Sequence, residues 1–136
     1  MNAKILLVDD HLDAAARLTA SLKTHGYEVL LARNGMDAFN TAHLFQPDLI
    51  LLDLTLDGMD GFLVCEILRR QPSTAMTPII LMTVLAGEVA RVNGLGSGVD
   101  DFVSKPVRPE DLLPRMEALL QSRQSIRADP SDLQRA

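Results

Sequence analysis

Residues 49–53 read LILLD, and residues 5–10 read ILLVDD in the same form, a short continuous apolar run that ends in acid. A continuous apolar run, rather than one that alternates with polar residues, is typical of a parallel strand covered on both faces. Shorter segments over 27–32, 78–83 and 102–104 also favour strands. The sequence therefore predicts five strands, two of which end in carboxylates.

Segments with helical spacing alternate with these strands, over residues 12–25, 35–45, 60–70, 86–97 and 109–122. Gly26 closes the first segment, and Pro109 with Glu110 opens the last. Such alternation predicts an α/β fold, a doubly wound (βα)5 sandwich with right-handed crossovers. We expect a flavodoxin-like parallel sheet in the strand order 2-1-3-4-5, whose functional groups lie beyond the carboxyl ends of the strands.

The length and composition fit one globular domain. The chain has 136 residues, of which 47% are hydrophobic and 23% are charged, and a core of this size can bury roughly two-thirds of the unfolded surface. We expect the domain to span residues 1–122. Residues 123–136 lose apolar periodicity and are interpreted as a polar C-terminal tail or linker stub.

Charge and cysteine content exclude several classes of function. Residues 1–122 carry 10 Lys or Arg and 16 Asp or Glu, a net charge of −6, which argues against direct contact with nucleic acid. Cys65 is the only cysteine, so an intrachain disulfide is excluded and a reducing, cytoplasmic location is favoured. No stretch resembles a signal peptide or a membrane span.

Polar side chains stand at four of the five strand ends: Asp9-Asp10, Asp53, Thr83 and Lys105-Pro106. In the expected order the first and third strands are neighbours, so three carboxylates lie within a few ångströms of one another. Like charges at that distance must protonate, separate or share a cation. A site built from oxygen atoms suits Mg²⁺.

Four motifs in this order, LLVDDH, LLDLTLDGMDGF, IILMTVLAG and GVDDFVSKPVRPEDLL, resemble those of the receiver domains of bacterial response regulators, over roughly residues 3–122. The resemblance implies that Asp53 accepts a phosphoryl group from a sensor histidine kinase or a His-phosphotransfer protein in a Mg²⁺-dependent reaction. It also implies a conformational switch that acts on a downstream effector or output domain, with the domain serving as a phosphoacceptor rather than an enzyme.

The resemblance assigns roles to individual residues. Asp9, Asp10 and Asp53 would hold Mg²⁺, and the backbone carbonyl of Thr55 would complete the protein ligands. Lys105 would pair with Asp53 and later with a phosphoryl oxygen. These roles agree with phosphoryl transfer, which depends on positioning and charge neutralisation.

The switch is expected to involve Thr83 and Phe102. The Thr83 hydroxyl would donate to the phosphoryl group, and the Phe102 ring would turn inward as Thr83 moves. Because phenylalanine has no hydroxyl, this movement would depend on ring burial alone. The Lys105–Pro106 bond is expected to be cis. We expect a homodimer to form through the face made by helix 86–97, strand 102–104 and helix 109–122.

Three other functions compete with this interpretation. A haloacid-dehalogenase-like phosphatase needs a second Asp two residues after its nucleophile, and Thr55 occupies that position. A degenerate receiver used only for docking would lack site residues that are present here. A flavin-binding relative of the same topology would need a phosphate loop and an aromatic stack that the sequence does not offer.

Other residues receive no assigned chemistry. His11, His25 and His43 are scattered and show no metal-binding spacing, although His11 adjoins the acidic pair. Cys65 lies on an apolar helical stretch and is expected in the core. Asp57 occupies a loop position where receiver domains usually carry proline, so this loop gains a charge and loses a fixed φ.

Val84 follows Thr83, where receiver domains commonly carry alanine or another small residue. We expect its bulk to narrow the entrance to Asp53. Small phosphodonors should therefore phosphorylate Asp53, and water should hydrolyse the adduct, more slowly than in a Val84→Ala variant. Intact-mass time courses with acetyl phosphate measure both rates, and equal rates in the two proteins would contradict this expectation.

Overall fold

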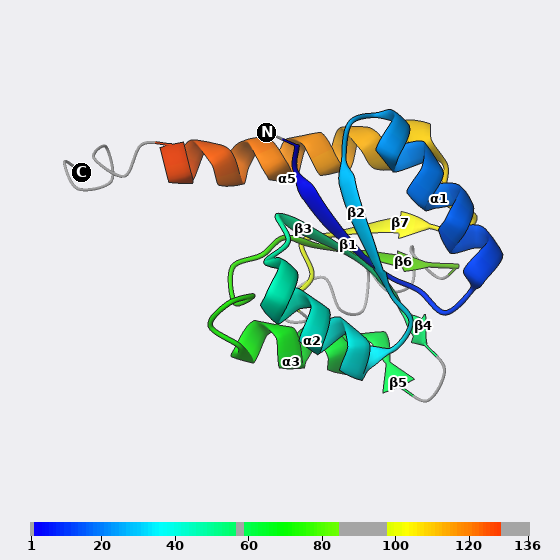
Figure 1. Cartoon of the computed structure of the whole chain (residues 1–136), viewed down its shortest axis with the longest axis horizontal. Helices are drawn as coiled ribbons and strands as arrows, with labels where there is room; N and C mark the ends of the chain where they lie inside the picture. The colour runs from blue at the N-terminus through cyan, green and yellow to red at the C-terminus, as the bar shows by residue number, and fades with distance from the viewer. Residues whose placement is uncertain (1, 57–58, 85–97, 129–136) are drawn as a thin grey trace.

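The structure is a computed structural model that describes residues 2–56, 59–84 and 98–128, with side chains up to residue 122. Five parallel strands form one sheet in the order β2-β1-β3-β6-β7 (Figure 1). Along the chain they are β1 Lys4–Val8, β2 Glu28–Ala32, β3 Leu49–Asp53, β6 Ile79–Thr83 and β7 Asp101–Ser104. The described helices are α1 Leu12–Thr24, α2 Gly35–Phe45, α3 Gly61–Arg70 and α5 Pro109–Ala128.

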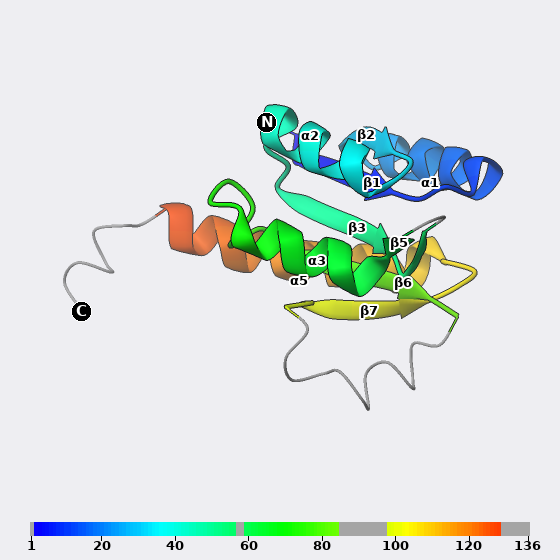
Figure 2. The same ribbon diagram turned by 90° about the horizontal axis from the view of Figure 1, so that it is seen from below.

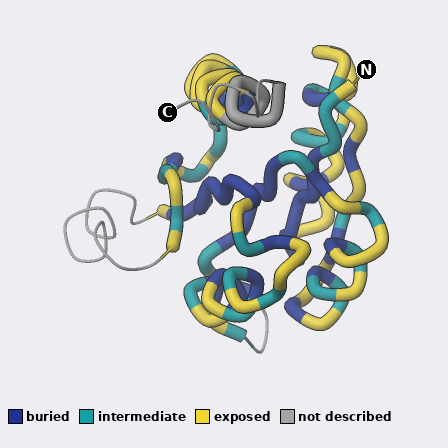
Figure 3. The backbone as a smooth tube through the Cα atoms, turned by 90° about the vertical axis from the view of Figure 1, so that its left-hand side faces the viewer, coloured by how far each residue is buried: buried dark blue, intermediate teal, exposed yellow. Residues whose placement is uncertain are grey.

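Helices cover both faces of this sheet, as the two perpendicular ribbon views show (Figure 2). Side chains of successive strand residues point to opposite faces, so each strand supplies two cores. Leu6 and Leu52 pack in the core beneath α2 and α3, whereas Ile5 and Leu51 pack in the core beneath α1 and α5. Buried residues run through the centre of the molecule (Figure 3). The side chains of β1 and β3 are buried on both faces of the sheet, which explains their continuous apolar sequences.

The predicted topology is confirmed: β6 and β7 are the fourth and fifth strands of the expected 2-1-3-4-5 order. The strand register then decides what meets at the carboxyl edge. Val8 pairs with Leu52, and Asp53 pairs with Met82. Asp9 therefore comes level with Asp53 as β1 ends. Thr83 pairs with Ser104, which places Lys105 beyond the same edge.

Two details differ from the sequence expectation. Helix α5 continues to Ala128 rather than ending at residue 122, because residues 123–128 contain neither glycine nor proline and a loss of apolar spacing alone does not stop a helix. A short antiparallel pair, β4 Thr55–Leu56 and β5 Met59–Asp60, precedes α3. Strands of two residues are too short to give a periodic pattern. The expected helix 86–97 lies outside the described residues.

Cys65 is confirmed as a core residue. Its side chain, on α3, is fully buried, and this burial raises the pKa of the thiol. Among the helices that the structure describes, none combines the length and the apolar character needed to span a membrane.

Arg69, at the end of α3, ties this helix to the starts of β6 and β7. Its Nε donates to the carbonyl of Gly98 at 2.9 Å, and its guanidinium also donates to the carbonyl of Thr77. It pairs with Asp100 at 2.8 Å, and the same Asp100 oxygen accepts from the backbone N–H of Ile79. The starts of β6 and β7 are thereby held to α3 by hydrogen bonds that are charge-assisted.

Gly61 begins α3 directly against the end of β3. A Cβ atom at this position would lie 2.6 Å from the carbonyl oxygen of Asp53 and 2.7 Å from the Cα atom of Leu54. The N–H of Gly61 also donates to the Leu54 carbonyl at 2.8 Å. Because these neighbours are backbone atoms, a larger residue cannot be accommodated by rotating a side chain.

Gly61→Ala should therefore destabilise the protein by about 1–3 kcal/mol, the usual cost of overpacking. Gly35→Ala is the matched control at the start of α2, because its Cβ would meet the flexible end of the Met59 side chain instead of backbone. Urea unfolding followed by circular dichroism measures both changes. A loss for Gly35→Ala as large as that for Gly61→Ala would show that the backbone contact is not the cause.

Candidate functional site

The polar residues expected at the strand ends lie together at the carboxyl edge of the sheet. Ligand atoms of Asp9, Asp10, His11 and Asp53 all lie within 4.8 Å of one another. Asp9 and Asp53 are buried, with 3% and 2% of their surface exposed. The predicted clustering of three carboxylates is thus confirmed, and a histidine ring joins them.

Asp53 is contacted at both carboxylate oxygens. Its Oδ2 lies 2.7 Å from the Nζ of Lys105, and its Oδ1 accepts a hydrogen bond from the backbone N–H of Thr55 at 3.1 Å. Its position at the end of β3 is set by the backbone, since Leu54 N–H donates to the Met82 carbonyl at 3.0 Å. The Asp53 side chain is therefore held in one place, next to the positive charge of Lys105.

Burial raises the pKa of Asp53 above its ordinary value. The Lys105 ammonium and the Thr55 N–H act in the opposite direction, and the charge of Asp9 adds to the increase. Removing a carboxylate from water disfavours its charged form. The ionised form of Asp53 is thus disfavoured at this position. A bound cation would stabilise the negative charge, and conversion of the carboxylate to an ester would remove it.

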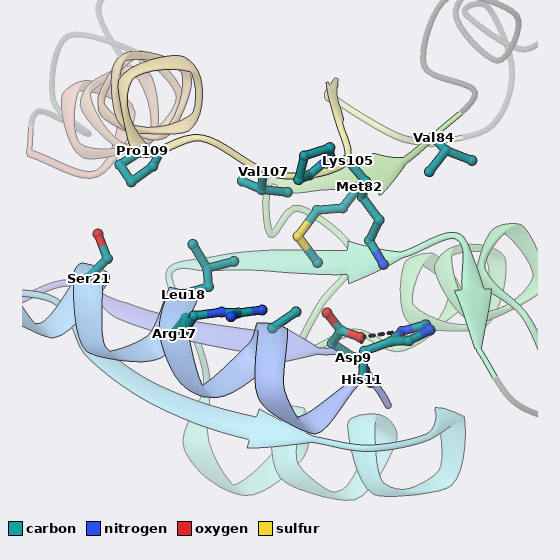
Figure 4. A pocket seen from close by; sticks show the side chains of 12 residues that line it. Asp9, His11, Arg17, Leu18, Ser21, Met82, Val84, Lys105, Val107 and Pro109 are labelled. Atoms are coloured by element: carbon teal, nitrogen blue, oxygen red, sulfur yellow. Dashed lines mark hydrogen bonds and ion pairs between the residues drawn. The ribbon is translucent and has the colours of Figure 1, made fainter.

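His11 belongs to this cluster, although its sequence spacing did not indicate a metal-binding role. Its Nδ1 lies 3.1 Å from an oxygen of Asp9, 3.1 Å from one of Asp10 and 3.3 Å from Oδ2 of Asp53. The hydrogen bond with Asp9 raises the pKa of His11, while Lys105 opposes this effect. Figure 4 shows the ring beside Asp9. In the sequence, the feature that pointed to this contact was the position of His11 directly after the acidic pair.

The remaining predicted residues border the cluster. Thr83 ends β6 with 3% of its surface exposed, and its carbonyl accepts from the Lys105 N–H at 3.0 Å. Phe102 is partly buried and packs against the core beneath α2 and α3. The Lys105–Pro106 bond is cis, as expected. The ligand role of the Thr55 carbonyl stays a prediction, and Asp57 lies outside the described residues.

A cavity of about 540 Å³ adjoins the cluster, between α1 and the residues that follow β7 (Figure 4). Asp9, His11 and Lys105 line the end nearest the carboxylates. The remaining lining is mostly apolar and comprises Ala14, Arg17, Leu18, Ser21, Met82, Val84, Pro106, Val107 and Pro109. Val84 stands at this cavity with 72% of its surface exposed. A reactant can therefore approach the carboxylates from the α1 side.

The donor set fits a small divalent cation. Three carboxylates at the ends of two adjacent strands supply the oxygen ligands that Mg²⁺ prefers. One Lys105 ammonium does not balance three negative charges, so a cation would also lower the repulsion among them. The arrangement is suited to a reaction in which an anionic group must approach the ionised Asp53.

Comparisons with known proteins agree on one family. The family model described as the response regulator receiver domain matches residues 5–117. The chain is 43% identical over 120 residues to the response regulator PleD of Caulobacter vibrioides, covering 88% of this chain and 26% of that protein. It is 39% identical over 133 residues to the regulatory protein PhoP of Bacillus subtilis, covering 98% and 54%. The chain thus spans about a quarter and about half of these relatives.

Solved structures give the same result. The chemotaxis response regulator CheY4 of Vibrio cholerae superposes with a TM-score of 0.81 at 29% identity, covering 88% of this chain and 99% of that one. The receiver domain of the sensor histidine kinase PA1611 of Pseudomonas aeruginosa, which has a magnesium ion coordinated in its active site cleft, gives 0.80 at 30% identity and covers 89% and 99%.

The raised pKa of Asp53 predicts a pH dependence of stability. From the ordinary carboxyl value near 3.8 up to the raised value, the folded state holds more protons than the unfolded state, so the free energy of unfolding falls as pH rises through this window. Asp53→Asn should remove this fall and be the more stable protein at neutral pH.

Urea unfolding across a pH series in EDTA measures the effect. Asp13→Asn, which removes an exposed carboxylate from α1, is the matched control and should retain the wild-type decline. If Asp53→Asn and Asp13→Asn show the same pH profile, buried charge at Asp53 is not the origin.

Proposed function

Because this chain belongs to the family of response regulator receiver domains, we propose that it receives a phosphoryl group on Asp53 in a two-component phosphorelay. The observation that carries the proposal is the position of Asp53. It ends β3 inside a cluster of three carboxylates, and its Oδ2 lies 2.7 Å from the Lys105 ammonium. Phosphoryl transfer needs this combination of a fixed nucleophile and adjacent positive charge.

Asp9, Asp10 and Asp53 are proposed to hold Mg²⁺ together with the backbone carbonyl of Thr55. The clustered carboxylates support this assignment. The cation supplies positive charge that offsets the charge of the phosphoryl oxygens. The hydrogen bond from Thr55 N–H to Asp53 Oδ1 keeps that oxygen in place, so the acceptor does not have to be reoriented before reaction.

In the transfer itself, a carboxylate oxygen of Asp53 attacks the phosphorus of a phosphohistidine. A P–O bond forms and the P–N bond of the donor breaks. The electron pair of the broken bond stays on the donor nitrogen, and the ring leaves as neutral imidazole when its other nitrogen carries a proton. The product is an acyl phosphate on Asp53, and the protein has supplied positioning rather than acid–base chemistry.

Lys105 and Thr83 are proposed to recognise the product. Lys105 would exchange part of its contact with Asp53 for a phosphoryl oxygen, and the Thr83 hydroxyl would donate to another oxygen. Movement of Thr83 would make room for Phe102 to turn inward, which its partial burial and its register beside Leu81 support. A changed surface at β7 would then be presented to the downstream partner.

Family membership places the chain among proteins that work with histidine kinases and output domains. We propose a sensor histidine kinase or a His-phosphotransfer protein as donor, which approaches by the cavity beside α1. The net charge of −5 does not support direct nucleic-acid binding. We also propose a homodimer contact through β7 and α5, whereas the expected helix 86–97 lies outside the described residues.

A phosphoacceptor that assists its own phosphorylation and dephosphorylation is favoured over a phosphatase. Thr55 occupies the position of the second Asp that a haloacid-dehalogenase-like enzyme requires, and its side chain cannot act as a general acid or base there. We propose a cytoplasmic location, which is supported by the single cysteine of the chain, because one cysteine cannot form an intrachain disulfide. The domain itself is proposed to span residues 1–122, with residues 123–136, whose first part continues α5 to Ala128, as a polar C-terminal tail or linker stub.

Incubation with acetyl phosphate and Mg²⁺ should add one phosphoryl group to Asp53, detected by intact mass and by the base lability of the adduct. Asp53→Asn should remove the adduct, and Lys105→Ala should slow its formation by about a hundredfold, as when one charge-stabilising group is lost. Asp13→Asn should react as the wild type does.

Three other outcomes of this experiment would contradict the proposal. Steady release of phosphate without any adduct would indicate a phosphatase. The absence of an adduct with both acetyl phosphate and a phosphorylated His-phosphotransfer protein would indicate a docking module. An adduct that persists in Asp53→Asn would place the acceptor at another residue.

A further inference from the structure

We propose that the imidazole Nδ1 of His11 is itself a ligand of the cation at this site, and that it shifts the preference of the site from Mg²⁺ toward first-row transition cations such as Co²⁺. The inference deepens the proposed function and rests on its metal site. The usual acidic residues provide only oxygen ligands, so a nitrogen ligand would change the chemistry of the site rather than merely its strength.

The distances are those expected of neighbouring ligands. The Nδ1 atom lies 3.1, 3.1 and 3.3 Å from single oxygens of Asp9, Asp10 and Asp53. In octahedral coordination with bonds of about 2.1 Å, adjacent ligand atoms are about 3 Å apart. One nitrogen is therefore adjacent to all three oxygens, and all four atoms lie within 4.8 Å of one another.

The backbone of His11 is fixed beside the cluster. His11 is the N-cap residue of α1, its N–H donates to Asp9 Oδ1 at 2.9 Å, and its carbonyl accepts from the Ala15 N–H at 2.9 Å. The ring itself contacts the same Asp9 oxygen through Nδ1 at 3.1 Å. Its side chain is 60% exposed, so a hydrated cation can reach the nitrogen directly from solvent.

Ligand chemistry gives the direction of the preference. Carboxylate oxygens suit Mg²⁺, which retains several waters, whereas imidazole nitrogen suits the later first-row divalent cations. A similar receiver domain coordinates magnesium in its active site cleft, so a cation in this region of the fold has a precedent. At such a site, His11 would strengthen the binding of transition cations much more than the binding of Mg²⁺.

The alternative is that His11 is only a surface residue that caps α1 and pairs with nearby acids. That role would affect every divalent cation in a similar way, through charge and local stability. A nitrogen ligand would instead affect Co²⁺ much more than Mg²⁺. The ratio of the two affinities therefore separates the two roles, whatever the absolute strength of binding.

The experiment uses the full chain stripped of metal with EDTA and titrated separately with Co²⁺ and Mg²⁺ by isothermal titration calorimetry. His11→Phe removes the nitrogen, and His11→Asn removes it while keeping a favourable N-cap residue. Both variants should lower the Co²⁺ to Mg²⁺ affinity ratio by about tenfold or more. His43→Phe, which replaces an exposed histidine near the end of α2, should leave the ratio unchanged.

Proton NMR of the Co²⁺-loaded protein gives a second readout. Coordination through Nδ1 leaves a proton on Nε2, which should give one strongly shifted resonance that disappears in D₂O and is missing from both His11 variants. An unchanged affinity ratio, or a resonance that persists in His11→Asn, would overturn the inference. Neither measurement uses a phosphodonor, whereas failure of the wild-type chain to form an Asp53 adduct would overturn only the proposed function.

Discussion

Mutual repulsion among Asp9, Asp10 and Asp53 is the constraint on which the site depends. Parallel pairing of β1 with β3 brings their carboxyl ends level, and the burial of Asp9 and Asp53 weakens the screening that water would provide. The surrounding groups reduce this repulsion. Lys105 pairs with Asp53, the His11 ring contacts all three carboxylates, and backbone N–H groups fix the oxygens.

The fold can maintain this unfavourable cluster because the rest of the sheet is strongly apolar. β1 and β3 are buried on both faces and contribute to two separate cores. Burial of a Leu or Ile side chain contributes roughly 1.5–3 kcal/mol, so several such residues on each strand outweigh the cost of crowding three acids at one edge. The two cores therefore hold the clustered carboxylates in place.

Much of the fold and site was predictable because it follows from periodicity and parallel topology. Continuous apolar runs identified the strands, and their polar ends identified Asp9, Asp10, Asp53, Thr83 and Lys105. The His11 contact was not predictable in this way, because sequence spacing does not determine the side-chain rotamer of an exposed residue. The β4–β5 pair is too short for a pattern, and the end of α5 lacks a stop signal before Ala128.

Helix α3 is fixed at both of its ends. Gly61, its first residue, lies against the backbone of Asp53 and Leu54, and Arg69, near its last turn, donates to the carbonyl of Gly98. Arg69 also pairs with Asp100, so the start of β7 is tied to the same helix. A probe attached to α3 would thus serve as an internal reference in a sensor built from this domain.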